Sequence, residues 1–249
     1  MDKKYEILND RYIIINGRKL FRIRALKDFQ TIQGLTVKVG DLGGYIQSEK
    51  NLSQEGDCWV ANDAKVFDNA YVCDNARVFD NASVCGNAMV YNSAFVSENA
   101  CVYGNARVFD NASVYGDACV SNDAWVSDNA CVSDNTCVCG NAYIFENAYV
   151  YGKTCVCSNA EIGNNADICN DRDYICIKGL GSISATTFYK CKDNQIGVTC
   201  DCFNGTLDEF ISYIKSTDEN TKFDKEYLAI VEVVKIHFGL DKNTSATTI

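Results

Sequence analysis

Cysteine is the residue type whose spacing in this chain most readily suggests chemistry. The chain has 15 cysteines. Several recur every eighteen residues (Cys101, Cys119, Cys137, Cys155) or form C-x-C pairs (Cys137/Cys139, Cys155/Cys157, Cys200/Cys202). Thiolates bind soft metals and act as nucleophiles, but no C-x-x-C motif occurs and a nucleophilic cysteine needs a neighbouring base. We therefore interpret the cysteines as small residues tolerated on strand faces, and predict neither a metal site nor a cofactor.

Histidine, the usual general base near neutral pH, is almost missing from the chain. The single histidine is His237, which falls in the last predicted helix. A histidine near a helix C-terminus interacts favourably with the helix dipole, so we predict a surface position for it. The sequence therefore predicts no catalytic residue.

One polar cluster is a candidate for ligand binding. Thr186, Thr187, Tyr189 and Lys190 lie close together in a predicted strand, where their hydroxyl and ammonium groups could hold a small polar molecule. The alternative is an ordinary strand surface whose polar side chains are satisfied by their neighbours.

A six-residue repeat dominates the elements that must position these side chains. From Val60 to Ile168 every sixth residue is Val or Ile, nineteen times in succession, and the residue four places after each of these but the last is Ala, with Thr136 and Thr154 as the only substitutes. The alternation around each Val indicates a short strand. The polar pair that follows, commonly Asp-Asn or Gly-Asn, indicates a corner, because Asn tolerates the left-handed backbone. Strands and corners at a fixed interval predict a coil whose stacked turns pair in parallel.

The unit V-x-x-N-A-x resembles the hexapeptide repeat of left-handed parallel β-helix proteins, in which three hexads make one triangular coil. The resemblance covers residues 58–171 and implies about six coils, or a column on the order of 30 Å tall. Members of that family are often trimers, and its acyltransferases use a histidine on the column as the general base. A carbonic-anhydrase activity in the same family needs three histidines on zinc. Residues 58–171 contain no histidine, so neither activity carries over to this chain.

With three hexads per coil, the residues that flank each Val or Ile are expected on three outer faces. One face carries Trp59, Arg77, Phe79, Phe95, Tyr115, Tyr149 and Tyr151. The next carries Lys65, Phe67, Tyr103 and the cysteine stack, and the third carries Tyr71, Tyr91, Arg107, Phe109, Trp125, Tyr143 and Phe145. So much aromatic surface indicates an interface or groove, or else ladders that only stabilise stacked strands. Arg107 and Trp125 become stack neighbours, which predicts a cation–π contact and makes them a second candidate binding pair.

The N-terminal end, residues 1–57, does not repeat. Two β-rich runs surround Asn16-Gly17, a strong hairpin signal, and a glycine-rich stretch leads into the first hexad. Because an open coil exposes strand edges, we predict that this region is a β cap.

The C-terminal end is predicted to be a small α+β domain over residues 172–240, followed by a disordered tail, 241–249. Three strands precede a helix that starts at a Thr206/Glu209 capping box, and a second helix spans about Lys225–Phe238 and stops at Gly239. The predicted fold class is therefore mainly β: a left-handed parallel β-helix with an N-terminal β cap and a small C-terminal α+β domain.

Charge and composition limit the partners and the compartment. The net charge is −10, and residues 58–171 have four Lys or Arg against fourteen Asp or Glu, which argues against nucleic-acid binding along the column. Corner carboxylates are expected to serve turn geometry and solubility. No apolar run long enough to cross a membrane and no signal peptide is present. The odd cysteine count then favours free thiols in a reducing cytoplasm.

The predicted function is binding rather than catalysis. The stretch ALKDF…GDLGGYI…NLSQEGDCWV resembles the lead-in of bacterial and phage hexapeptide-repeat proteins, some of them labelled acyltransferases. The stretch TTFYK…VTCDCFNGTLDEF resembles a small domain of phage and prophage proteins of unassigned role. We predict a phage- or prophage-type scaffold protein, a homo-oligomer with a trimer favoured, that presents its ends or inter-subunit surfaces to a host protein or a small signalling ligand. The alternative is a divergent hexapeptide-repeat acyltransferase that lacks the usual histidine base.

Overall fold

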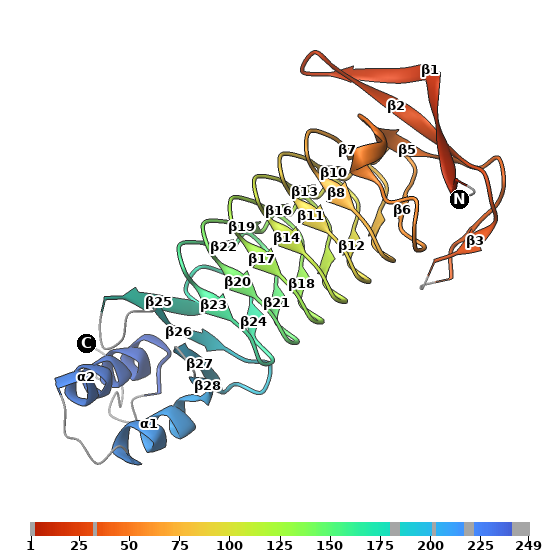
Figure 1. The fold of residues 1–249 in the computed structure, drawn as a ribbon. Coiled ribbons are helices and arrows are strands. Elements are labelled where there is room, and N and C mark those ends of the chain that lie inside the picture. Colours follow the sequence, from red (N-terminus) through yellow and green to blue (C-terminus); the bar gives the residue numbers. More distant parts are fainter. Residues whose placement is uncertain (1–2, 32–33, 180–184, 201–202, 217–221, 241–249) are drawn as a thin grey trace, which may run out of the picture.

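The computed structural model describes residues 3–31, 34–179, 185–200, 203–216 and 222–240. The chain forms an elongated column, with a β hairpin at one end and a small α+β module at the other (Figure 1). The predicted tail, 241–249, and Cys202 lie outside the described residues.

Three parallel sheets form the sides of the column, which confirms the predicted parallel β-helix. The cysteine sheet contains β5 (Leu42–Ile46), β7 (Lys65–Val66), β10 (Ser83–Val84), β13 (Cys101–Val102), β16 (Cys119–Val120), β19 (Cys137–Val138) and β22 (Cys155–Val156). The Trp125 sheet contains β8 (Tyr71–Val72), β11 (Met89–Val90), β14 (Arg107–Val108), β17 (Trp125–Val126), β20 (Tyr143–Ile144) and β23 (Glu161–Ile162). The Arg77 sheet contains β6 (Trp59–Val60), β9 (Arg77–Val78), β12 (Phe95–Val96), β15 (Ser113–Val114), β18 (Cys131–Val132), β21 (Tyr149–Val150) and β24 (Asp167–Ile168).

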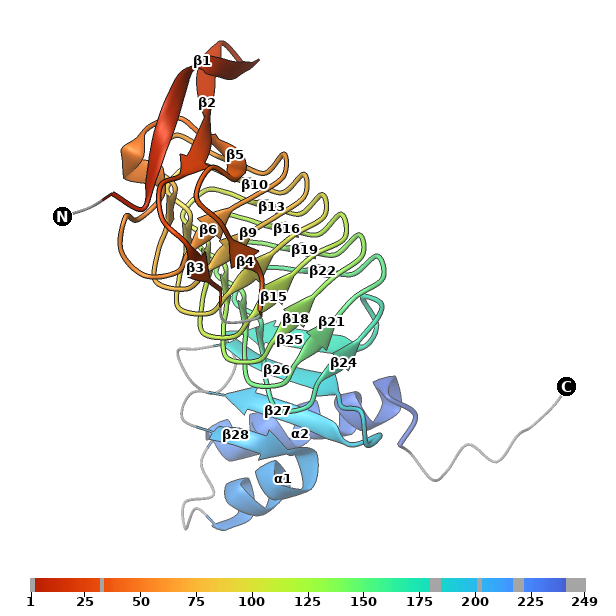
Figure 2. The same ribbon diagram turned by 90° about the vertical axis from the view of Figure 1, so that its right-hand side faces the viewer.

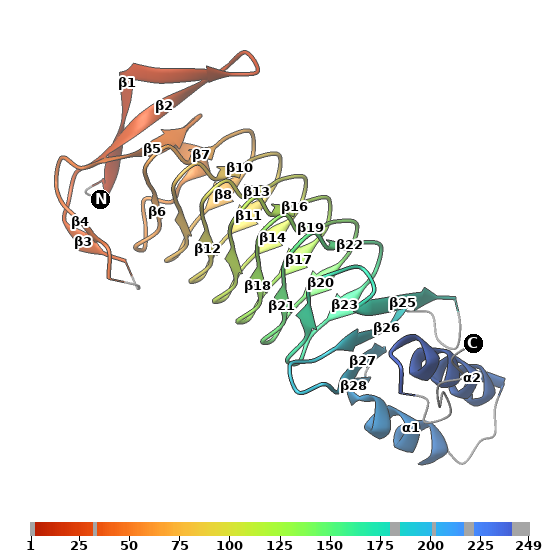
Figure 3. The same cartoon turned by 180° about the vertical axis from the view of Figure 1, so that it is seen from behind.

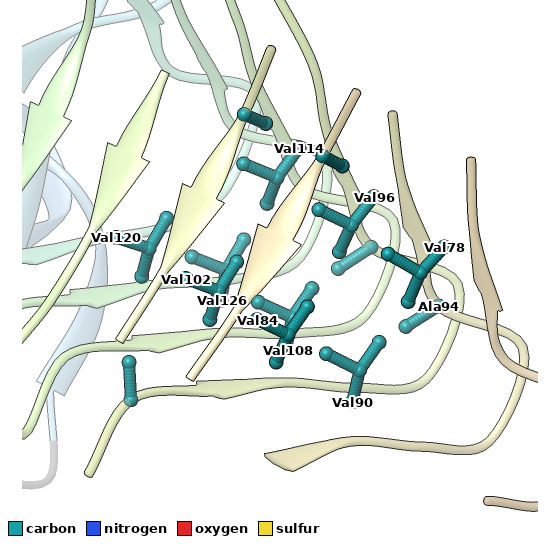
Figure 4. Packing of buried hydrophobic residues seen from close by; sticks show 14 of the residues in the cluster. Val78, Val84, Val90, Ala94, Val96, Val102, Val108, Val114, Val120 and Val126 are labelled. Atoms are coloured by element: carbon teal, nitrogen blue, oxygen red, sulfur yellow. The ribbon is translucent and has the colours of Figure 1, made fainter. Parts of the chain in front are cut away.

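Each residue of a coil stacks on its counterpart in the next coil. Val84 pairs with Val102, and Arg107 with Trp125. The repeated Val, Ile and Ala side chains point inward and are fully buried, so the column is packed with side chains and has no lumen (Figure 4). Small alanines beside the corners leave room for the valines in the middle of each side, which is why the Val-to-Ala spacing is strict.

The corners refine the prediction about asparagine. The left-handed backbone falls on the first residue of each polar pair, for example Asp68 with φ 59° and Glu98 with φ 58°, and not on the Asn that commonly follows. At four corners this first residue is itself Asn: Asn62, Asn92, Asn122 and Asn164. The Asn in second place instead stacks on its counterpart one coil along: Asn69 Nδ2 donates to Asn87 Oδ1 at 3.0 Å, and Asn87 Nδ2 donates to Asn105 Oδ1 at 2.9 Å. The repeated Asn therefore builds a side-chain ladder along the edge of the column.

The corner carboxylates have a structural role beyond the predicted turn geometry. A carboxylate oxygen accepts a hydrogen bond from the backbone N–H of the corner residue one coil along: Glu98 from Gly116 at 3.0 Å, and Asp134 from Gly152 at 3.0 Å. At the start of the column, Gln47 Oε1 takes this place and accepts from Asp68 N at 2.9 Å. Part of the negative charge of the column is thus needed to satisfy backbone donors.

The solenoid starts earlier than the hexads indicate. Strand β5 pairs in parallel with β7, Leu52 forms a parallel bridge to Val72 after the 3-10 turn η1 (Glu49–Asn51), and β6 completes this irregular coil. The column consequently has about seven turns instead of six. The hexad pattern misses this coil because the spacing is interrupted once: the buried Ile46 and Leu52 are six residues apart, but Leu52 and Val60 are eight apart.

The N-terminal hairpin blocks the open edge of the cysteine sheet. Strands β1 (Tyr5–Ile15) and β2 (Arg18–Ala25) are antiparallel, and β2 pairs with β5. Asn16 and Gly17 occupy the turn with φ 48° and 78°, as the hairpin signal predicts. A second pair, β3 (Phe29–Gln30) and β4 (Thr36–Val37), lies beside β6 (Figure 2).

Polar side chains satisfy the first coil from inside this cap. The Lys4 ammonium is fully buried and donates to the carbonyl oxygens of Glu55, Gly56 and Cys58 at 3.0–3.2 Å. The Tyr5 hydroxyl donates to Leu52 O at 2.7 Å. The first coil has no preceding coil to take up these groups, so the cap supplies their partners.

The C-terminal module lies beyond the last coil (Figures 1 and 3). Its antiparallel sheet has four strands where three are predicted: β25 (Tyr174–Lys178), β26 (Ala185–Lys190), β27 (Ile196–Cys200) and β28 (Phe203–Thr206). Helix α1 (Leu207–Ser216) follows the capping box, in which Glu209 N donates to Thr206 Oγ1 and Thr206 N donates to Glu209 Oε2. Helix α2 (Lys222–His237) begins one turn earlier than predicted and ends before Gly239, whose φ is 69°.

Candidate functional site

The predicted outer faces are real, and each corresponds to one sheet of the column. In-register stacking brings side chains eighteen residues apart into contact on the same face. Function must therefore be sought in what these faces, and the junctions with the terminal modules, place together.

A continuous strip of rings runs along the Trp125 sheet. We call Tyr91, Phe109, Trp125, Tyr143 and Phe145 the aromatic strip. Successive ring centroids lie 5.0, 6.2, 6.0 and 4.7 Å apart. Such separations are typical of stabilising aromatic pairs, so the strip serves the stacking of the coils as well as forming a surface.

Exposure along the faces is more uneven than the sequence suggests. Trp125 is 40% exposed and Tyr103 on the cysteine sheet is 41% exposed. Trp59 and Phe67, both predicted on the outside, are buried. The Phe29 ring covers Trp59 edge-on at 5.4 Å, so the N-terminal cap hides the start of its face. The sequence alone could not show this, because the covering residue lies thirty positions away.

The predicted pair of Arg107 and Trp125 is in contact. The Arg107 guanidinium carbon lies 5.1 Å from the Trp125 ring centroid, and both residues are exposed. The aromatic strip thus carries one cation at its most accessible ring.

The polar cluster in the C-terminal module matches the alternative of a strand whose polar side chains are satisfied by their neighbours better than it matches a ligand site. Thr186, Thr187 and Tyr189 are buried. The Thr187 hydroxyl oxygen accepts from Glu161 N at 3.0 Å, and the Tyr189 hydroxyl accepts from Asn164 Nδ2 at 3.0 Å. Thr187 and Tyr189 thus dock β26 onto the last coil, whereas the Thr186 hydroxyl donates to Cys200 Sγ at 3.1 Å within the module. These contacts argue against an open ligand site at this position.

Lys190, the fourth member of that cluster, points to the other side of the strand and stays half exposed. Its ammonium forms an ion pair with Asp173 at 2.5 Å. Burial tends to raise the pKa of the Asp173 carboxyl, but the bonds from Lys190 and from Cys169 N outweigh burial and lower it.

A shallow hollow at this junction contains the lone histidine. Asn170, Arg172, Asp173, Lys190, His237 and Phe238 line it. His237 lies in the last turn of α2 and is exposed, as predicted, but its Nε2 also lies 2.9 Å from the Arg172 carbonyl oxygen. The Asp173 carboxylate is occupied by backbone and lysine donors. Within this hollow, among the described residues, no carboxylate contacts the imidazole, so the arrangement favours docking of α2 over acid–base chemistry.

The cysteine sheet brings together thiols that the sequence analysis interprets only as small residues tolerated on strand faces. The cysteines of the described residues are all free. The Sγ atoms of Cys137, Cys139 and Cys155 lie within 4.8 Å of one another. The C-x-C pairs and the eighteen-residue spacing are the signals that could have predicted this cluster, once three hexads per coil are assumed.

Comparisons with known proteins support the architecture and no specific activity. A family model described as the YdcK beta solenoid repeat matches residues 82–98 and 100–116, which span β10 to β15 in the middle of the column. The chain is a β-solenoid repeat protein. A comparison with curated proteins found no match.

No helix within the described parts of this solenoid protein is long and apolar enough to cross a membrane.

Proposed function

We propose that this β-solenoid protein is a non-catalytic scaffold or binding protein, and that the aromatic strip is its binding surface. The observation that carries the proposal is the strip itself, a row of rings on a rigid face with exposed Arg107 and Trp125 in its middle. Trp and Arg are the residues most enriched among the energetically dominant positions of protein interfaces.

The first partner that this surface fits is another copy of the same chain. Neighbouring rings already cover much of one another, so association needs to bury only the outer edges of the rings. Arg107 on one copy would lie close to corner carboxylates on the next, which offsets repulsion between two acidic columns. A trimer is the expected state, by the resemblance to hexapeptide-repeat proteins.

The capped ends agree with a structural role. The hairpin and the C-terminal module cover the two ends of the column, so open strand edges do not drive end-to-end growth. In this proposal the protein acts in the cytoplasm, as a phage- or prophage-type scaffold, and presents its terminal modules or the grooves between copies to a host protein or a small signalling ligand.

Light scattering after gel filtration tests self-association. The wild-type chain should elute as an oligomer, and Trp125→Ser combined with Arg107→Ser should shift it to the monomer. Tyr103→Ser is the matched control, since Tyr103 has the same exposure as Trp125 but lies on another sheet. A wild type that stays monomeric at all concentrations, or a control that dissociates equally, would contradict the proposal.

The alternative function, an acyltransferase without the usual base, is tested separately. Purified protein with acetyl coenzyme A and a panel of amine and hydroxyl acceptors should release no free thiol above the uncatalysed rate. Transfer to any acceptor would overturn the non-catalytic reading. His237 and Lys190 would then be the first residues to substitute, because they line the same hollow.

A further inference from the structure

We propose that Cys137, Cys139 and Cys155 bind one thiophilic d¹⁰ metal ion, such as Zn²⁺ or Cu⁺, through three thiolates on the outer face of the cysteine sheet. This site is independent of the aromatic strip and of the proposed scaffold function. It also departs from the prediction made from the cysteine spacing alone.

The backbone places the three thiols on one side of two adjacent strands. Cys137 and Cys139 flank Val138, whose side chain is buried in the core, so both cysteines point outward. Cys155 on β22 pairs in register with Cys137 on β19. Cys137 and Cys139 come from one strand and Cys155 from the strand beside it, so the three thiols form a compact triangle. A single C-x-C motif supplies only two of these thiols.

The size of the triangle suits a metal–thiolate centre. The three Sγ atoms lie within 4.8 Å of one another. Zinc–sulfur bonds of about 2.3 Å in tetrahedral geometry place the sulfurs roughly 3.8 Å apart, so modest rotation of the cysteine side chains would close the ligand set. Cys155 is exposed and the other two thiols are half-buried, which leaves the fourth position open to water or to another ligand.

Without a bound cation, the surroundings of the three thiols disfavour their charged, thiolate form. Burial, together with the nearby thiols Cys119, Cys139 and Cys155, raises the pKa of Cys137 to about 12. Burial and Cys139 likewise raise the pKa of Cys155. A bound cation reverses this preference, because the three sulfurs coordinate it as thiolates and release their three protons to the solvent. Binding should therefore strengthen as the pH rises.

Stacking of the coils does not require cysteine at these positions. The equivalent ladder positions nearer the N-terminal end hold Lys65 and Ser83, and the coil stacks on them in the same register. The run of cysteines from Cys101 to Cys155 along this ladder, joined by Cys139 beside Cys137, is thus not explained by the fold.

Cadmium titration of the reduced full-length protein tests the site. Cd²⁺ should produce thiolate-to-metal charge-transfer absorption that saturates at one ion per chain, and Zn²⁺ or Cu⁺ should compete for it. Cys137→Ser, Cys139→Ser and Cys155→Ser should each weaken binding at least tenfold. Cys101→Ser is the matched control, because Cys101 occupies the same ladder and is also exposed; this variant should bind as the wild type does.

Mapping of alkylation by mass spectrometry gives a residue-level readout. Saturating Cd²⁺ should protect Cys137, Cys139 and Cys155 from iodoacetamide and leave Cys101 reactive, with circular dichroism confirming that each variant is folded. The proposal is overturned if the triple-serine variant binds Cd²⁺ as tightly as the wild type, or if Cys101→Ser weakens binding as much as Cys155→Ser does.

Discussion

Two threonines replace the small alanine of the repeat, and their hydroxyls meet different surroundings. Both are buried at 1% exposure. Thr154 Oγ1 donates to the Tyr151 carbonyl oxygen at 2.9 Å, whereas Thr136 Oγ1 has no hydrogen-bond partner in the described part of the chain. An unsatisfied buried hydroxyl costs about 1–3 kcal/mol, and a satisfied one is roughly neutral or better.

The two threonines therefore predict opposite responses to alanine. Thr136→Ala should be neutral or stabilising by up to about 1 kcal/mol, because relief of the unpaired hydroxyl outweighs the lost methyl group. Thr154→Ala should destabilise by about 1–2 kcal/mol, since a hydrogen bond and a methyl group are both removed. Urea denaturation followed by circular dichroism measures both, and equal destabilisation by the two substitutions would contradict the argument.

The acidic residue at a corner must adopt a left-handed backbone and also accept a hydrogen bond from the next coil. Asp134 adopts φ 55° and accepts a hydrogen bond from Gly152 N. Asp134→Ala removes the hydrogen-bond acceptor and puts alanine in the left-handed region. We therefore expect the free energy of unfolding to fall by about 1–3 kcal/mol. Asp134→Asn keeps an amide oxygen and tolerates this backbone, and should stay within about 0.5 kcal/mol of the wild type. Thermal unfolding of the two variants checks the difference; a similar loss in both would mean that charge matters more than geometry.

At the scale of elements, the terminal modules differ in how they close the column. The N-terminal cap extends a sheet and adds a buried ammonium, Lys4. The C-terminal module instead lays β26 across the last coil, with Ala166 bridged to Cys191 and the Tyr189 ring packed into the column core. The two modules also pair different groups: Lys4 and Tyr5 donate to carbonyl oxygens of the first coil, whereas Thr187 accepts from the Glu161 N–H of the last coil.

The C-terminal junction should weaken in acid. The pKa of Asp173 lies below its ordinary value of 3.8, because hydrogen bonds from Lys190 and Cys169 N outweigh the opposing effect of burial. A carboxyl with a lowered folded-state pKa contributes stability above its unfolded pKa and loses it as the pH falls through the folded value. The wild type should thus be more stable than Asp173→Asn at neutral pH, and this gap should narrow below about pH 4.

Chemical denaturation of both proteins across this pH range measures the gap. Asp28→Asn is a suitable comparison, because Asp28 is an exposed carboxyl whose pKa is also lowered but which lies far from the junction, in the N-terminal module. A gap between wild type and Asp173→Asn that stays constant with pH would contradict the role assigned to Asp173.

At the scale of the whole molecule, the eighteen-residue turn makes the column modular. Deletion of residues 101–118 removes one coil and keeps every later residue on its own face, so the protein should fold with a smaller denaturant m-value, since less surface is exposed on unfolding. Deletion of residues 101–106 keeps the Val and Ala core but moves each later hexad to the next face. The aromatic strip would then be split, whereas the corner Asn would still stack, because it recurs in most hexads.

Circular dichroism and urea titration of the two deletions measure this prediction. Both proteins should keep β structure. The free energy of unfolding per remaining coil should be lower for the 101–106 deletion than for the 101–118 deletion, although the former removes fewer residues. Equal stability per coil would show that the outer ladders contribute little to the column.

The shared core and the outer faces were predictable for different reasons. A period of six with Val and Ala at fixed places can bury its apolar residues in few ways, so the parallel coil follows from the pattern. The three faces follow from the resemblance to hexapeptide-repeat proteins, which implies three hexads per coil. The hairpin at Asn16-Gly17 and the Thr206/Glu209 capping box are local signals and also appear as predicted. The irregular first coil through β5 and Leu52 was missed because eight residues instead of six separate Leu52 from Val60, which interrupts the period.

The sequence by itself determined the repeat, the packed Val and Ala core, the order of residues along each face and the shortage of bases for catalysis, because these depend on residue types and spacing within the repeat. Only the tertiary structure decided which face residues remain accessible and which thiols meet. Phe29 covers Trp59, β26 buries Thr187 and Tyr189, and β22 brings Cys155 to Cys137. Each of these depends on chain segments far apart in the sequence packing against one another, and a local pattern carries no information about which distant segment will cover or complete it.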